Sequence, residues 1–74
     1  MEVWKMKIKG IVVKYNQASG IIKDENNIKY IFTKNNIKDD LALKENDEVI
    51  FLPEKFNTIE ITENIATFIE KKTN

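Results

Sequence analysis

The stretch KYIFTKNNI (29–37) decides the fold, because it alternates like a half-buried strand and then enters an Asn-rich turn. Successive side chains on a strand leave opposite faces, so Tyr30 and Phe32 point one way while Ile31 and Thr33 point the other. We expect the two aromatic side chains to enter a core. The function then depends on what the other face of this strand contacts.

The rest of the chain shows similar short alternating runs, separated by polar turns. NQASG (16–20) and KDENN (23–27) are typical turn sequences, and the segment 35–46 favours a loop with a short helical turn. Pro53 is expected to end the fourth run, because proline supplies no N–H to a sheet. Ile59 and Ile61 are expected to add a few extended residues. The predicted strands cover 5–13, 21–22, 28–33, 47–52 and 64–70.

The order of these strands predicts an all-β barrel. Three consecutive strands joined by tight turns are followed by a longer connection and two more strands, which is typical of a small closed barrel of Greek-key type. An SH3-like barrel has the same number of strands and stays open as an alternative. The 74 residues form one domain, with 1–6 as an N-terminal extension and 71–74 as a frayed tail.

Composition removes most enzymatic functions. The chain has no cysteine and no histidine, so the usual zinc ligands, the commonest general base and the Ser-His and Cys-His nucleophilic sites are missing. The adjacent acids Asp24–Glu25 and Asp39–Asp40 lack the spacing of a calcium loop and are interpreted as solvated turn residues. We therefore expect a protein that is not an enzyme and uses no metal or cofactor.

The N-terminal segment mixes charges with apolar residues, so it resembles neither a signal peptide nor a membrane span. We expect a cytoplasmic protein that does not contact membranes.

The net charge of zero conceals two opposite halves. Residues 1–38 contain eight lysines and three acids, a charge of +5, whereas residues 39–74 contain four lysines and nine acids, a charge of −5. Such an asymmetry suggests an anionic partner for the basic half. A mixed, solvated surface is the alternative interpretation, because lysines are common on exposed strands.

Four motifs resemble the cold-shock domain, an OB-fold family that binds single-stranded RNA and DNA. KGIVVKYN (9–16) is similar to its first strand, Lys-Gly-x-Val-Lys-Trp-Phe-Asn, and YIFTKNNI (30–37) to its second ribonucleoprotein motif. LKENDEVIF (43–51) and ENIATFI (63–69) match later strands in the same order. The resemblance implies a five-stranded Greek-key OB-fold barrel, with these buried positions: Ile8, Val12, Ile22, Tyr30, Phe32, Ile37, Val49, Phe51 and Ile65.

The departures from the family lie where its members hold bases. The loop before Ile22 is shorter, so SGII replaces the first ribonucleoprotein motif and one stacking Phe has no counterpart. At the other contact positions Tyr15 keeps a ring, whereas family aromatics and a His are replaced by Lys14, Ile21, Ile31, Thr33 and Lys34. Since a base stacked on an aromatic ring contributes about 1–3 kcal/mol, most of the non-electrostatic affinity is expected to be lost.

The resemblance therefore implies weak, salt-sensitive binding of single-stranded nucleic acid, without strong sequence preference, through lysines of the first three strands. The alternative is a protein-interaction module that kept the barrel and uses the face around Ile21 and Ile31 for a protein partner. The candidate nucleic-acid-binding residues are Lys9, Lys14, Tyr15, Ile21, Lys23, Lys29, Ile31, Thr33 and Lys34.

Three further aromatic side chains have two interpretations each. Tyr15 either stacks on a base or packs at the barrel rim, and the rim is favoured because half-buried strand tyrosines are common. Trp4 either lengthens the first strand or covers a barrel edge. Phe56 is either an exposed ring or a plug over the barrel end, and the plug is favoured.

Overall fold

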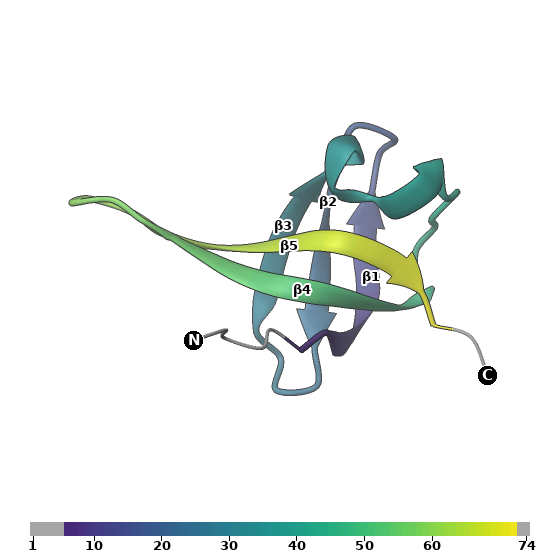
Figure 1. Cartoon of the computed structure of the whole chain (residues 1–74), viewed down its shortest axis with the longest axis horizontal. Helices are drawn as coiled ribbons and strands as arrows, with labels where there is room; N and C mark the ends of the chain where they lie inside the picture. Colours follow the sequence, from purple (N-terminus) through teal and green to yellow (C-terminus); the bar gives the residue numbers. More distant parts are fainter. Residues whose placement is uncertain (1–5, 73–74) are drawn as a thin grey trace, which may run out of the picture.

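The computed structural model describes residues 6–72 apart from the side chain of Asp40, and the role expected for Trp4 falls outside this range. The chain forms a closed barrel in which the neighbour order is β1-β2-β3-β5-β4 (Figure 1). Two short 3-10 turns, η1 (Lys34–Asn36) and η2 (Lys38–Asp40), connect the third strand to the fourth. The strands are β1 (Ile8–Tyr15), β2 (Ser19–Asp24), β3 (Lys29–Thr33), β4 (Glu48–Asn57) and β5 (Thr62–Lys71).

This topology confirms the predicted all-β, five-stranded barrel and is that of an OB-like fold. Strands β1, β2 and β3 form an antiparallel meander, and β4 pairs antiparallel with both β1 and β5. Strand β5 meets β3 in parallel through the single pair Ile31 and Ile65, which closes the barrel. The meander thus presents one outer face that is bordered by β5.

The core contains the expected residues, with one exception. Ile8 packs against the core from a half-buried position, and the other expected core residues are buried except Ile65. Ala66 points inward instead, so its neighbour Ile65 lies on the outer face beside Ile31. The buried apolar residues are Val12, Ile22, Tyr30, Phe32, Ile37, Leu43, Val49, Phe51, Ala66 and Ile69.

The sequence predicted that strand β4 ends at Pro53, and this prediction is wrong. The strand continues to Asn57, with Pro53 opposite Ala66 on β5. The last pair between β4 and β1 is Ile8–Phe51, so no strand lies beside β4 on this edge at Pro53. The N–H that proline lacks is therefore not needed for a hydrogen bond to β1. Proline is tolerated because β4 has become an edge strand at this point.

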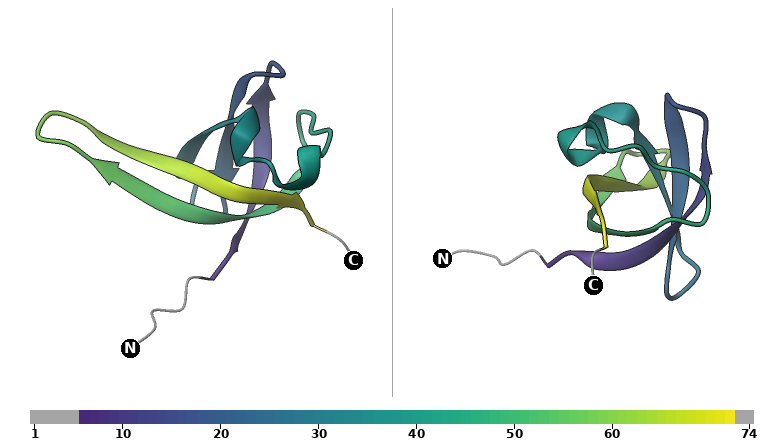
Figure 2. Two further views of the ribbon diagram at one scale, coloured as in Figure 1. Left: turned by 45° about the horizontal axis from the view of Figure 1, so that its top comes forward. Right: turned by 90° about the vertical axis from the view of Figure 1, so that its right-hand side faces the viewer.

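Beyond the barrel, β4 and β5 continue as a two-stranded arm that projects away from the body (Figures 1 and 2). Phe56 lies on this arm and is 55% exposed, so the prediction that it plugs the barrel end is wrong. Ile59 was expected to be extended, but it lies in the bend that joins the strands and is fully exposed. The arm projects because the register of β4 and β5 extends past the last pairing of either strand with β1 or β3.

Asp24 is buried at the end of β2, which contradicts its interpretation as a solvated turn acid. Its carboxylate accepts hydrogen bonds from the backbone N–H groups of Asn26 and Ile28 and from the Tyr30 hydroxyl, at 2.8, 3.0 and 3.0 Å. Burial alone would raise the pKa of Asp24, but these donors outweigh it and lower the pKa. Burial, and then the bond to Asp24, raises the pKa of Tyr30.

Lys71 and Lys72 are paired, although the sequence predicted a frayed tail over 71–74, and residues 73–74 lie outside the described range. Strand β5 includes Lys71, and the backbone N–H of Lys72 donates to the carbonyl oxygen of Glu48 at 3.0 Å. Their ammonium groups also lie 3.7 Å from Asp47 and 3.8 Å from Glu48. Backbone pairing to β4 therefore orders this segment as far as Lys72.

Candidate nucleic-acid interface

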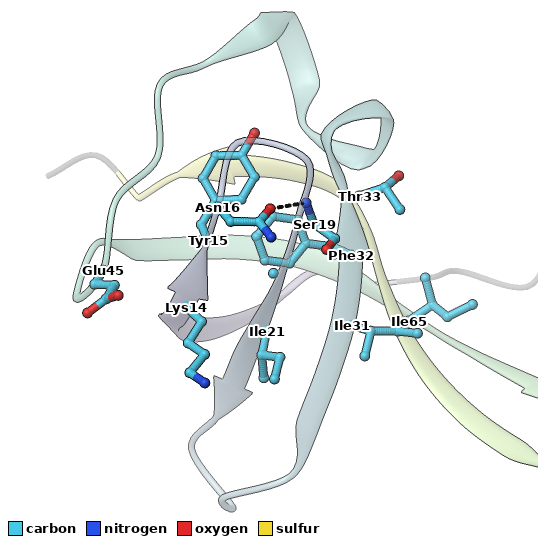
Figure 3. Close-up of a pocket in the computed structure, with 11 residues that line it drawn as sticks. Lys14, Tyr15, Asn16, Ser19, Ile21, Ile31, Phe32, Thr33, Glu45 and Ile65 are labelled. Atoms are coloured by element: carbon cyan, nitrogen blue, oxygen red, sulfur yellow. Dashed lines mark hydrogen bonds between the residues drawn. The ribbon is translucent and has the colours of Figure 1, made fainter.

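The outward side chains of the meander form rows that run across the strands. Lys14 on β1 lies opposite Ile21 on β2, Ile21 opposite Ile31 on β3, and Ile31 beside Ile65 on β5. Figure 3 shows these four side chains around one concave region. Three neighbouring isoleucines thus make an apolar row with a lysine at one end, and Ile21 and Ile31 lie on one outer face.

An irregularity in β1 fixes the position of Lys14. The β1–β2 register runs from the pair Val12–Ile22 directly to Lys14–Ile21, so Val13 is an extra residue on β1. Such a bulge lets two residues oppose one and re-aims the side chains that follow. As a result Lys14 is exposed and lines the concavity, although Val12, two residues before it on the same strand, is buried.

The concavity encloses about 560 Å³, and its floor is made by aromatic rings over a glycine. Tyr15 and Phe32 pack with ring centroids 5.4 Å apart, and Gly20 is paired with both residues. Tyr15 is half-buried, in agreement with the rim interpretation, yet its ring also borders the open space (Figure 3). The lining residues are Lys14, Tyr15, Asn16, Ser19, Gly20, Ile21, Ile31, Phe32, Thr33, Glu45 and Ile65.

Two short turns hold the upper edge of the concavity. The Asn16 side-chain oxygen accepts the backbone N–H groups of Ala18 and Ser19, each at 2.9 Å. The Asn36 side-chain oxygen accepts the backbone N–H of Thr33 at 2.8 Å, where β3 passes into η1. These bonds leave the Thr33 side chain exposed on the outer face. Lys34 follows at the start of η1 and is also exposed.

A second row lies below the isoleucines and carries more positive charge. Ile11 pairs with Lys23, and Lys23 pairs with Lys29. Lys9, two residues before Ile11 on the same side of β1, lines a smaller concavity together with Lys23, and Glu25 and Glu48 also border it. The predicted lysines of the three strands therefore share one face of the barrel.

The candidate lysines keep their charge available to a ligand. The ion pairs between residues 6 and 72 join Lys7 to Glu70, Lys71 to Asp47 and Lys72 to Glu48. None of these three lysines is among the candidate residues, although Lys72 also lines the smaller concavity. Lys9, Lys14, Lys23, Lys29 and Lys34 thus make no ion pair with any other residue in the described part of the chain. The acids in these three ion pairs all belong to the C-terminal half, and they pair with lysines that are not candidate binding residues.

Sequence reasoning missed several residues of this interface. Ile65 joins it only through the parallel contact of β5 with β3, and a pairing between such distant segments leaves no local pattern. Phe32 was expected in the core, where it is, but its ring also forms the floor. Glu45 enters from the loop after η2. Gly20 was the one signal of this interface in the sequence, because an isolated glycine in a strand marks a place where another group packs closely on the backbone.

In comparisons with known proteins, no family model and no curated protein sequence matches the chain. Between residues 6 and 72, no helix has the length and apolar character needed to cross a bilayer. The same part of the chain holds no cluster of three or more His, Cys, Asp or Glu side chains placed to bind a metal ion. The interface is therefore interpreted from its own geometry.

Proposed function

We propose that this chain is a non-catalytic binding module that holds single-stranded RNA or DNA against the outer face of β1–β3. The observation that carries the proposal is the placement of Lys9, Lys14, Lys23 and Lys29 on one face, around an apolar concavity and without ion-pair partners between residues 6 and 72. The motif order similar to cold-shock domains supports the same function. An OB-like barrel offers this face to oligonucleotides.

The chemistry of the face sets the expected binding mode. Lysine ammonium groups contact phosphates without reading sequence. The row of Ile21, Ile31 and Ile65 offers apolar contact to sugars and base edges but no ring on which a base can stack. Tyr15 supplies one ring edge at the rim. Binding is therefore weak, tolerant of sequence and steeply dependent on salt.

A second function, the binding of a protein partner, is favoured by the same isoleucine row. Ile31 is 44% exposed and lies between Ile21 and Ile65, so the exposed apolar surface is contiguous rather than scattered. Contiguous exposed apolar residues mark interaction sites. In this case the lysines would select an acidic partner, and oligonucleotides would not bind.

The test is an NMR titration of amide shifts with oligo-dT and oligo-U at low and at high salt. We expect shifts on Lys14, Tyr15, Ile21 and Ile31 that fade as salt rises. With two to four phosphate contacts, the slope of log affinity against log salt is about −1.4 to −2.8. No shift at low salt would overturn the proposal and leave the protein-partner function.

Charge reversal at one lysine, with a matched control, tests the position of the interface. Lys29→Glu places a negative charge within the lysine row and should weaken binding strongly. Lys55→Glu makes the same change on the projecting arm, where Lys55 pairs with Asn64. We expect the control to retain most of the affinity, and equal losses in both variants would argue against a defined face.

A further inference from the structure

A bulge in β5 places an aromatic ring on the surface of the barrel. The register of β4 and β5 passes from the pair Ile50–Glu70 to the pair Leu52–Thr67, so Phe68 and Ile69 together oppose a single residue of β4. Phe68 adopts a positive φ of 50° and is 60% exposed, whereas Ile69 is fully buried. The bulge therefore determines which of these two side chains enters the core.

Regular alternation would give the opposite arrangement. Ala66 points inward, so an unbroken strand would bury Phe68 and expose Ile69, because a one-residue slip exchanges the two faces. Instead the larger apolar side chain is exposed, and a bulky residue occupies the left-handed region that disfavours it. Both features oppose folding. Backbone strain of this kind persists at binding sites, and bulges re-aim side chains there.

The exposed ring borders a third concavity, here called the Phe68 concavity. It encloses about 440 Å³ and is lined by Asn35 and Asn36 of η1, Ile37, Lys38, Thr67 and Phe68. An aromatic ring, side-chain amides and an ammonium group match the three parts of a nucleotide: a base to stack, base edges to hydrogen-bond, and a phosphate to neutralise. The lining thus combines the groups that a single nucleotide requires.

This concavity continues from the main interface. Thr33 lines the main concavity and is followed directly by η1, which lines the Phe68 concavity. On β5, Ile65 lines the main concavity and Thr67 the Phe68 concavity. Two separate segments of the chain thus pass from one concavity to the other. A single strand that left the main face over η1 would therefore enter the Phe68 concavity.

We propose that Phe68, with Asn35 and Lys38, forms a further subsite that stacks one additional nucleobase of a single strand bound to the main face. The inference rests on the proposed function and extends it, since the stacking ring missing from the isoleucine row is supplied from β5. Affinity should then depend on oligonucleotide length. A short oligomer occupies the main face alone, and a longer one also covers Phe68.

The experiment compares oligo-dT of about 4 and about 8 nucleotides, lengths within the range that one OB barrel covers. We expect Phe68→Gly to leave the affinity for the short oligomer unchanged and to weaken the longer one about tenfold, the loss typical of one stacked base. Phe68→Tyr keeps a ring and should keep the length dependence. The Asn35 side-chain amide should shift with the longer oligomer only.

Thermal unfolding shows whether the loss of affinity in Phe68→Gly results from misfolding of the variant. Glycine adopts a positive φ without strain, which offsets the loss of the half-exposed ring, so Phe68→Gly should unfold cooperatively at a temperature close to that of the wild type. If the longer oligomer binds Phe68→Gly as well as it binds the wild type, the subsite is overturned while the main interface stands. If the wild type binds neither oligomer, the proposed function fails and the subsite fails with it.

Discussion

Gly20 on β2 lies opposite Phe32 on β3, and the Phe32 ring occupies the space where a side chain at position 20 would stand. A Cβ built on Gly20 would lie 2.6 Å from the ring and 2.3 Å from the carbonyl oxygen of Lys14. The ring therefore packs directly on backbone, and Tyr15 packs on the ring. This contact sets the depth of the candidate interface and has a direct test.

Gly20→Ala should destabilise the barrel. The added methyl group meets both a buried ring and the backbone of β1, so one of them has to move, and overpacking of this kind costs about 1–3 kcal/mol. Urea unfolding measures the change. Ser19→Ala is the matched control, because Ser19 is the exposed neighbour on the same strand, and it should change stability by less than about 0.5 kcal/mol. Unchanged stability of Gly20→Ala would mean that β1 and β2 separate freely at the rim.

Tyr30→Phe should destabilise the barrel through the loss of one hydrogen bond. The Tyr30 hydroxyl donates to the buried Asp24 carboxylate at 3.0 Å, and hydrogen bonds to charged groups contribute about 1.5–3 kcal/mol. Tyr15→Phe is the control, since the Tyr15 hydroxyl bonds to no other side chain or backbone group of residues 6–72. Thermal unfolding of both variants would show a lower midpoint for Tyr30→Phe alone. Equal midpoints would indicate that the hydroxyl contributes nothing.

Acid should weaken the fold through Asp24. Its pKa in the folded state is lowered, so Asp24 stabilises the protein above its unfolded pKa of about 3.9, and this contribution is lost as the pH falls below that value. Asp24→Asn should therefore be less stable than the wild type at pH 7 and lose less stability on acidification. Urea midpoints at about pH 7 and about pH 3 give both differences. The lowered pKa of Glu70, caused mainly by its hydrogen bond to Lys7, contributes equally to both proteins. Parallel losses in the two proteins would contradict a role for Asp24.

Ile31→Phe should strengthen binding if the main face holds bases. The new ring would stand in the middle of the isoleucine row and offer one stacking position, which is worth about 1–3 kcal/mol. Ile28→Phe is the control, because Ile28 is 43% exposed against 44% for Ile31 but lies in the turn between β2 and β3. Fluorescence anisotropy with labelled oligo-dT measures both variants. No gain from Ile31→Phe would favour the protein-partner function.

Local alternation was sufficient to predict most of the barrel. Tyr30 and Phe32 are buried as the 29–37 stretch predicted, and Ile21 and Ile31 lie together outside. These residues belong to a meander whose pairings connect neighbouring segments, so the sequence pattern carries the relevant information. The same holds for Lys9, Lys23 and Lys29, which follow from the phase of each strand, whereas Lys14 reaches the outer face only through the bulge at Val13.

The predictions failed where distant segments or irregular backbone decide the outcome. Ile65 was assigned to the core by the family resemblance, and only packing in the closed barrel shows that Ala66 lies inside instead. Pro53 was expected to stop β4 because it supplies no N–H. This expectation failed because the sequence does not show where β1 stops pairing with β4. The bulge at Phe68 breaks the alternation on which the phase of β5 was predicted.

The projecting arm also makes this protein a convenient scaffold. Its tip is closed by bonds within the turn itself, since the Thr58 N–H donates to the Ile61 carbonyl oxygen at 2.7 Å and the Ile61 N–H donates to the Thr58 hydroxyl at 2.9 Å. Ile59 contacts little else, being fully exposed. Loop closure costs only about 0.6 kcal/mol for each doubling of length. A guest peptide or a reporter domain inserted after Ile59 should therefore be carried far from the binding face, and the barrel would still fold.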